Sequence, residues 1–144
     1  MRILGIDPGY ERLGIAVLEK NLGDKKEMLL FSACFKTKAA LPLPERIFMV
    51  GVEVARVIAE WRPTMLAIEK LYFEKNTSSA MGVSEARGAI IFAARAAGLN
   101  VAEFTPQQIK SAVTGYGKAS KDGVQAMVRK LIVIPASVKQ DDEI

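Results

Sequence analysis

Three short apolar runs open the chain, before any stretch with helical periodicity. They cover residues 2–7, 13–18 and 28–35. Turn residues separate them, with Pro8 and Gly9 after the first run and Asn-Leu-Gly-Asp at 21–24 after the second. Short apolar runs joined by links this short are typical of antiparallel hairpins. The rest of the fold must therefore be built onto three antiparallel strands.

After residue 36 the pattern changes to helices that alternate with short strands. It predicts helices at about 44–61, at 77–98, from 106 onward and at about 121–132, with strands at 64–69 and 100–104. Pro44 suits a helix first turn and Pro63 ends that helix, while Thr105 and Ser120 suit N-caps. Helix 77–98 is rich in Ala and Gly, which allows close packing either on its own sheet or against a second subunit.

This order of elements predicts an α/β fold in which right-handed crossovers add parallel strands to the antiparallel unit. We expect a ribonuclease H-like fold with a five-stranded mixed sheet flanked by helices. A chain of 144 residues, half of them hydrophobic, suits a single domain over residues 1–144.

Composition narrows the chemistry available to this domain. The chain has no histidine and one cysteine, Cys34, which excludes Ser-His-Asp and Cys-His catalysis and a Cys/His zinc site within one chain. Without a leader or an apolar run near the ~20 residues of a membrane helix, we expect a cytoplasmic protein. A formal net charge of +4 permits a polyanionic partner without requiring one.

Acidic residues stand where two predicted strands end, at Asp7 and Glu69, and again near the chain end at 141–143. In this topology the first and fourth strands are neighbours, so Asp7 and Glu69 can approach within metal-bridging distance. Clustered carboxylates favour hard ions such as Mg²⁺ or Mn²⁺, and two ions roughly 3.5–4 Å apart would support phosphodiester cleavage. The alternative is that these acids are merely solvated at strand ends.

Several motifs together resemble the bacterial RuvC family of Holliday junction resolvases, over essentially the whole chain. They are Gly-Ile-Asp-Pro-Gly at 5–9, Leu-Gly at 13–14, Ala-Ile-Glu at 67–69, Tyr-Phe at 72–73, Gln-Gln-Ile-Lys at 107–110, and 121–128. The resemblance implies a ribonuclease H-like fold and a homodimer that makes paired, symmetric nicks in four-way junctions during homologous recombination and DNA repair. It also implies Mg²⁺, which Mn²⁺ can replace, held by four carboxylates, and a branch-migration motor, RuvA and RuvB, as partner.

Carried over residue by residue, the resemblance assigns the metal ligands. Asp7 matches the first family acid, Glu69 the second and Asp142 the third, or Asp141 if the register shifts by one. The fourth acid would fall immediately after Ile144, so we expect the closing helix to be truncated in this sequence. A junction-binding protein without cleavage is therefore an alternative function.

Basic residues gather in the stretch 105–130, which carries five lysines and arginines against one acid. The resemblance places Lys110 and Lys121 beside the scissile phosphate and gives Lys121 a catalytic role. The basic stretch itself makes Lys118 a further candidate DNA contact. In the polar loop after Glu69, Tyr72 and Phe73 are candidates to stack on junction bases. The alternatives are solvent-facing lysines and aromatic rings tucked beneath the loop.

Two other motifs suggest nucleotide binding, but they match their patterns less well than the resolvase motifs do. The glycines at 115–117 precede Lys118, but Ala112 and Ala119 break the phosphate-loop pattern. The Gly-Ile-Asp-Pro-Gly start is also similar to the phosphate hairpin of actin-like ATPases and sugar kinases. Those proteins enclose their nucleotide with a second lobe, which 144 residues cannot supply.

Overall fold

A computed structural model describes residues 1–71 and 77–139 of the chain. Within these ranges the strands are β1 (Arg2–Asp7), β2 (Arg12–Glu19), β3 (Met28–Lys36), β4 (Met65–Glu69) and β5 (Asn100–Phe104). The helices are α1 (Leu43–Trp61), α2 (Thr77–Ala96), α3 (Pro106–Thr114) and α4 (Lys121–Leu131). Among the described residues no helix combines the length and the hydropathy that a membrane span requires.

The five strands form one mixed sheet in the order β3-β2-β1-β4-β5. β1 pairs antiparallel with β2, and β2 pairs antiparallel with β3. On the other side β4 lies parallel to β1, and β5 lies parallel to β4. This topology confirms the predicted hairpin unit with parallel strands added to it, and with it the predicted α/β class.

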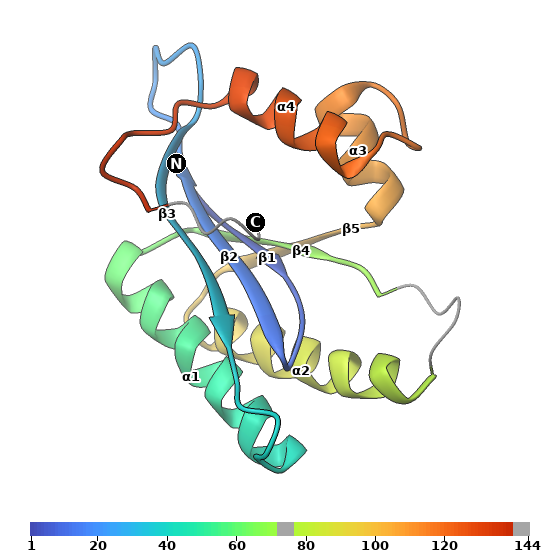
Figure 1. Ribbon diagram of the computed structural model, residues 1–144. Helices are drawn as coiled ribbons and strands as arrows, with labels where there is room; N and C mark the ends of the chain where they lie inside the picture. The colour runs from blue at the N-terminus through green and yellow to red at the C-terminus, as the bar shows by residue number, and fades with distance from the viewer. Residues whose placement is uncertain (72–76, 140–144) are drawn as a thin grey trace.

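The hydrophobic core lies between the sheet and the two long helices α1 and α2, which cover the same face (Figure 1). Side chains of a strand alternate between the two faces, so every second residue of β1 and β4 enters this core. The core is built from Leu4, Ile6, Leu13, Ile15, Val17, Val50, Val54, Val57, Ile58, Leu66, Ile68, Ile90, Ala94 and Leu99. Full burial of one such aliphatic side chain contributes about 1.5–3 kcal/mol.

Helix α2 uses its small residues to pack within this chain. Ala86 and Ala94 are fully buried, and Gly82 lies so close to the Tyr10 ring that a Cβ there would be 2.5 Å from Tyr10 Cε1. On its outer side, Met81 and Phe92 are 65% and 76% exposed. The inner face of α2 therefore packs on its own domain, and the outer face remains available to a partner.

A buried arginine fixes the hairpin turn that follows β1. Arg46, near the start of α1, is 8% exposed, and its Nε donates a hydrogen bond of 2.8 Å to Thr37 Oγ1. Its guanidinium carbon lies 5.0 Å from the centre of the Tyr10 ring, and Thr37 Oγ1 donates to the Tyr10 carbonyl. Tyr10 is thus held between α1 and α2, and the turn after Asp7 is held with it.

Helices α3 and α4 lie over the opposite face of the sheet (Figure 1). Neither has a fully buried residue among those the structure describes. The segment after α4 is tied to the β2–β3 hairpin, because Leu29 N donates to Val133 O at 2.9 Å and Val133 N donates to Glu27 O at 2.8 Å. The layer formed by α3 and α4 is therefore attached to the sheet at its C-terminal end, and it covers this face less tightly than α1 and α2 cover the other.

Candidate active site

Two carboxylates meet at one edge of the sheet. Asp7 ends β1 and Glu69 ends β4, and the parallel register that pairs Ile6 with Ile68 makes these last residues neighbours. Because Ile6 and Ile68 point into the core, the alternation of the strands directs Asp7 and Glu69 to the face that α3 and α4 cover. The two carboxyl groups interact directly, and each alters the pKa of the other.

The surroundings raise the pKa of both acids. Burial is the main cause for Asp7, opposed by the hydrogen bond from Glu69 and by the charge of Lys121. For Glu69 burial again raises the pKa most, followed by the charge of Asp7, while Lys110 lowers it. Two like charges this close disfavour each other's ionisation, which makes a neutralising cation favourable at this point.

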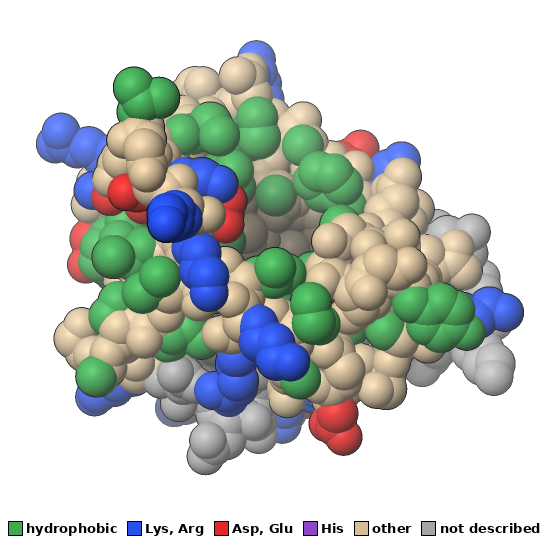
Figure 2. All heavy atoms as spheres, turned by 90° about the horizontal axis from the view of Figure 1, so that it is seen from above, with side chains coloured by type: hydrophobic (Ala, Val, Ile, Leu, Met, Phe, Trp, Pro, Cys, Tyr) green, Lys and Arg blue, Asp and Glu red, His purple; other side chains and the backbone are tan. Residues whose placement is uncertain are grey.

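Lys110 and Lys121 line the same cleft as the two acids, and the cleft has a volume of about 390 Å³. Lys110 comes from α3, and Lys121 is the first residue of α4. Figure 2, seen from above α3 and α4, shows a hollow in this face with lysine and arginine side chains gathered near it. The cleft therefore combines two acids with two cations, as binding of a phosphate beside a metal ion would require.

Caps set where the lysine-bearing helices begin. Thr105 and Gln108 form the predicted capping box of α3, with Thr105 Oγ1 accepting from Gln108 N at 3.1 Å. Ser120 caps α4, and its hydroxyl accepts from Gly123 N at 3.1 Å. Because Lys121 follows that cap directly, its position over the sheet is fixed by the helix start.

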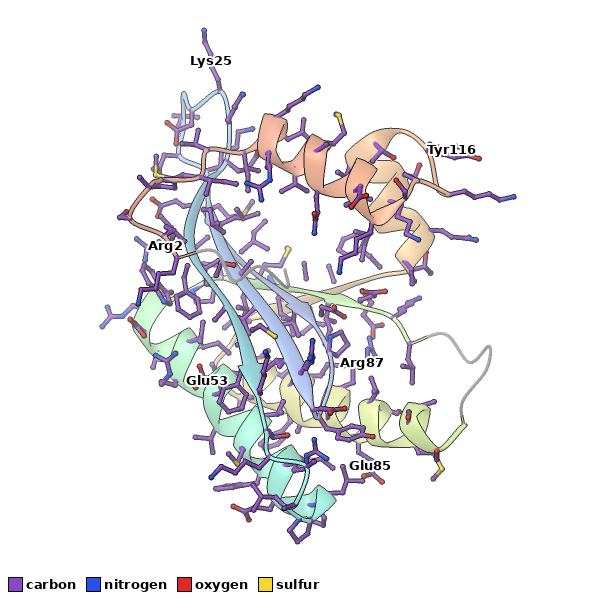
Figure 3. All side chains as sticks on the ribbon, viewed as in Figure 1. Arg2, Lys25, Glu53, Glu85, Arg87 and Tyr116 are labelled. Carbon is purple, nitrogen blue, oxygen red and sulfur yellow. The ribbon has the colours of Figure 1, made fainter. Side chains whose placement is uncertain are left out.

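Arg87 of α2 supports the end of β4 from the core side. Its Nε donates a hydrogen bond of 2.9 Å to the main-chain oxygen of Glu69, and its Nη2 binds the carboxylate of Glu103 on β5. Figure 3 labels this side chain between α2 and the sheet. The sequence analysis missed Arg87, although an arginine amid the small residues of a sheet-packed helix is a usable signal.

The other predicted residues fall outside this cleft or outside the described residues. Lys118 lines a separate groove of about 680 Å³ beside α3, together with Tyr116, which points outward (Figure 3). Tyr72, Phe73, Asp141 and Asp142 all lie outside the described residues. In the described ranges no three acidic, cysteine or histidine side chains come together to hold a metal.

A mixed sheet in this strand order, with paired acids where β1 and β4 end, defines a ribonuclease H-like domain. The model of the family "Crossover junction endodeoxyribonuclease RuvC" matches residues 3–143. A curated relative of that name from Desulfitobacterium hafniense is 43% identical over 142 residues, which are 99% of this chain and 85% of the relative. The chain belongs to the RuvC family.

Solved structures of relatives agree with this assignment. The Thermus thermophilus RuvC structure matches with a TM-score of 0.82 and 36% identity, over 91% of this chain and 80% of that one. T. thermophilus RuvC in complex with Holliday junction substrate matches with a TM-score of 0.87 and 33% identity, over 98% of this chain and 85% of that one. The likeness therefore extends to a relative captured with its DNA.

Proposed function

We propose that this chain is a crossover junction endodeoxyribonuclease, which resolves four-way Holliday junctions by paired, symmetric nicks in homologous recombination and DNA repair. Residues 1–144 form one nuclease domain in this proposal. The observation that carries it is that Asp7 and Glu69 line one cleft together with Lys110 and Lys121. Membership of the RuvC family, and the junction complex of its Thermus relative, name the substrate.

Asp7 and Glu69 fit a divalent metal ion. Carboxylate oxygens are the ligands that Mg²⁺ and Mn²⁺ prefer, and a cation between these two acids would neutralise the charge that raises the pKa of Glu69. We assign Mg²⁺, replaceable by Mn²⁺, with two ions per active site and Asp142, or else Asp141, as the third ligand. Bound there, the metal supplies a Lewis acid for the phosphate and a nucleophile at neutral pH.

The protein's own groups bind and orient the scissile strand. Lys110 and Lys121 attract the phosphate to the cleft, and Lys121, beside Asp7, stabilises the negative charge that develops as the ester bond breaks. Arg87 fixes the main chain of Glu69, which keeps that carboxylate turned toward the cleft. These roles require no histidine, in agreement with the composition.

Further DNA contacts come from residues around the cleft. Tyr72 and Phe73 stack on bases at the junction centre, and Lys118, in its separate groove, binds a more distant phosphate. RuvA and RuvB, the branch-migration motor, are the protein partners that the family implies.

In a homodimer each subunit contributes one such cleft, and each cleft cuts one of two symmetry-related strands of the junction. The outer face of α1 and α2 supports this assembly, because Phe48, Met81 and Phe92 are each more than 60% exposed there. Large apolar side chains grouped on one face mark an interaction surface, and a two-fold pair would bury the same patch from both copies.

Cleavage of a synthetic four-way junction, with a linear duplex as control, tests the proposal. We expect paired nicks at symmetric positions in Mg²⁺ or Mn²⁺, none in EDTA, and none from Glu69→Gln, which should still bind the junction. Tight junction binding by the unaltered chain without cleavage in either metal would instead establish a binding protein. Equal cutting of junction and duplex would contradict the substrate.

A further inference from the structure

The groove beside α3 is a hollow of its own, separate from the carboxylate cleft. It has a volume of about 680 Å³, and hydroxyl, amide and aromatic side chains line it together with one lysine, Lys118. The proposed function uses only this lysine, as the contact for a distant phosphate. Tyr116 and the polar side chains that make up the rest of the lining are left without a role.

Helix α3 stands between the groove and the cleft. Among its described residues one set lines the cleft and another lines the groove, namely Pro106, Ile109 and Lys110 against Gln107, Gln108 and Ser111. At about 3.6 residues per turn, the two sets point to opposite sides of the helix, about 150° apart. A helix with its side chains is about 10–12 Å across. A ligand in the groove therefore lies about one helix width from the scissile phosphate.

The loop that carries Tyr116 is held by its own hydrogen bonds. Tyr116 N donates to Thr114 Oγ1 at 3.1 Å, and Ala119 N donates to the Tyr116 carbonyl at 3.1 Å. Gly115, which ends α3, has a φ of 77°, a left-handed conformation that glycine adopts without strain. The main chain of Tyr116 is therefore fixed on both sides of the residue.

The ring of Tyr116 nevertheless lies in solvent. The residue is 61% exposed, and its side chain points outward (Figure 3). Within the described part of the chain, no hydrogen bond engages the Tyr116 hydroxyl or the side chains of Gln107 and Ser111. An exposed ring on a fixed loop is a platform on which a nucleic-acid base can stack, and unengaged amide and hydroxyl groups can bind the edge of that base.

The charge around the groove favours an anionic ligand. Residues 105–121 include Lys110, Lys118 and Lys121 and contain no acid. Lys118 lines the groove beside Tyr116, so a phosphate there would lie next to a stacked base. The volume falls within the range of about 300–1,000 Å³ that is usual for small-ligand sites. A ring, hydrogen-bonding groups and one cation in such a space match the three parts of a nucleotide.

We propose that this groove is a nucleotide-binding subsite, in which an unpaired base of the junction stacks on Tyr116 while its phosphate binds Lys118. The inference rests on the proposed nuclease function and adds a site beyond the cut. Paired bases in a linear duplex stack on each other, whereas bases can leave the stack where four arms meet. Stacking on Tyr116 therefore favours the junction over a duplex.

Binding in EDTA, where no strand is cut, tests the subsite. Junctions carry one abasic nucleotide at each position around the exchange point in turn. The variants are Tyr116→Ala, Tyr116→Phe, which keeps the ring, and Lys118→Gln. Lys25→Gln is the matched control for the lost charge, because Lys25 lies at the far tip of the β2–β3 hairpin (Figure 3). A linear duplex is bound in parallel, and melting temperatures check folding.

We expect one abasic position to weaken junction binding by the unaltered chain about 10-fold, as loss of one stacked base would. Tyr116→Ala should start about 10-fold weaker and lose nothing more at that position, while other positions respond as in the unaltered chain. Tyr116→Phe should bind like the unaltered chain, and Tyr116→Ala should leave duplex binding unchanged. Lys118→Gln should lower the salt slope of junction binding by about 1, and Lys25→Gln should not.

Losses that multiply at every abasic position would overturn the subsite, since no base would then depend on the ring. Tyr116→Phe as weak as Tyr116→Ala, or an equal loss on the duplex, would overturn stacking as well. Failure of the proposed function is a different result, in which the unaltered chain binds the junction without cutting it in Mg²⁺ or Mn²⁺. The coupling between Tyr116 and a base, measured in EDTA, decides the subsite in that case too.

Discussion

Replacing Asp7 by asparagine should make the protein more stable while it loses its activity. The pKa of Asp7 is raised from its usual 3.8, so the folded chain binds this proton more tightly than the unfolded chain does. For an acid shifted in this direction, stability falls as pH rises from the unfolded pKa through the folded one. At neutral pH the ionised Asp7 side chain therefore lowers the free energy of unfolding. Asp7→Asn removes this charge and with it the destabilisation.

The effect has two causes, first the burial of the Asp7 carboxylate and second the repulsion that its charge exerts on Glu69. Two ionised carboxylates about 4 Å apart repel by about 4 kcal/mol at an effective dielectric constant near 20. Asp7 is partly exposed at the mouth of the cleft, and screening by water reduces such energies to about 1 kcal/mol. For a chain of this size that corresponds to a rise in melting temperature of about 3–4 °C.

Thermal unfolding followed by circular dichroism measures this directly. In EDTA we expect Asp7→Asn to melt above the unaltered chain at pH 7.5, with the difference vanishing below about pH 4, where Asp7 is protonated. Mg²⁺ should raise the melting temperature of the unaltered chain and leave the variant unchanged. Junction cleavage should fall at least about 100-fold, with binding retained.

Glu85→Gln is the control for the loss of one acid, because Glu85 is exposed on α2 away from the cleft (Figure 3). It should change neither the melting temperature nor the cleavage rate. An Asp7→Asn variant that melts below the unaltered chain at pH 7.5 in EDTA would refute the reasoning, since neither burial nor repulsion would then make the Asp7 charge unfavourable.

Three further substitutions address other parts of the molecule. Lys121→Gln should lower the salt slope of junction binding by about 1, and an unchanged slope would remove its phosphate role. Gly82→Ala should destabilise the fold by about 1–3 kcal/mol in urea unfolding, because its Cβ would overlap the Tyr10 ring. Adding Tyr10→Ala should recover part of that loss, and equal stability of Gly82→Ala and the unaltered chain would contradict the contact. Phe92→Glu should convert the dimer to a monomer in analytical ultracentrifugation, whereas an unchanged dimer would place the interface elsewhere.

The elements of the fold were predictable because their signals are local. Pro63 and the caps at Thr105 and Ser120 are read within a few residues, and the helix and strand limits they predict agree closely with the structure. The meeting of Asp7 and Glu69 followed from topology, since both end strands that the predicted order makes adjacent.

Contacts between distant elements could not be predicted in this way. Arg46 lies four residues before Val50 on the apolar stripe of α1, a position that indicates burial, but its partners Thr37 and Tyr10 come from other elements. Lys118 shares the basic stretch with Lys121 yet lines a different groove, because the turn between α3 and α4 separates them. The direction of each lysine side chain depends on the conformation of that turn, and the number of charges in a stretch of sequence does not reveal it.

The unequal burial of the two helical layers has an evolutionary consequence. Substitutions in α1 or α2 disturb the core and cost folding stability, whereas α3 and α4 bury none of their described side chains completely. Selection for folding stability is therefore weaker on α3 and α4 than on α1 and α2. Descendants of such a chain can explore new sequence preferences through α3 and α4 while the sheet keeps its acids in place.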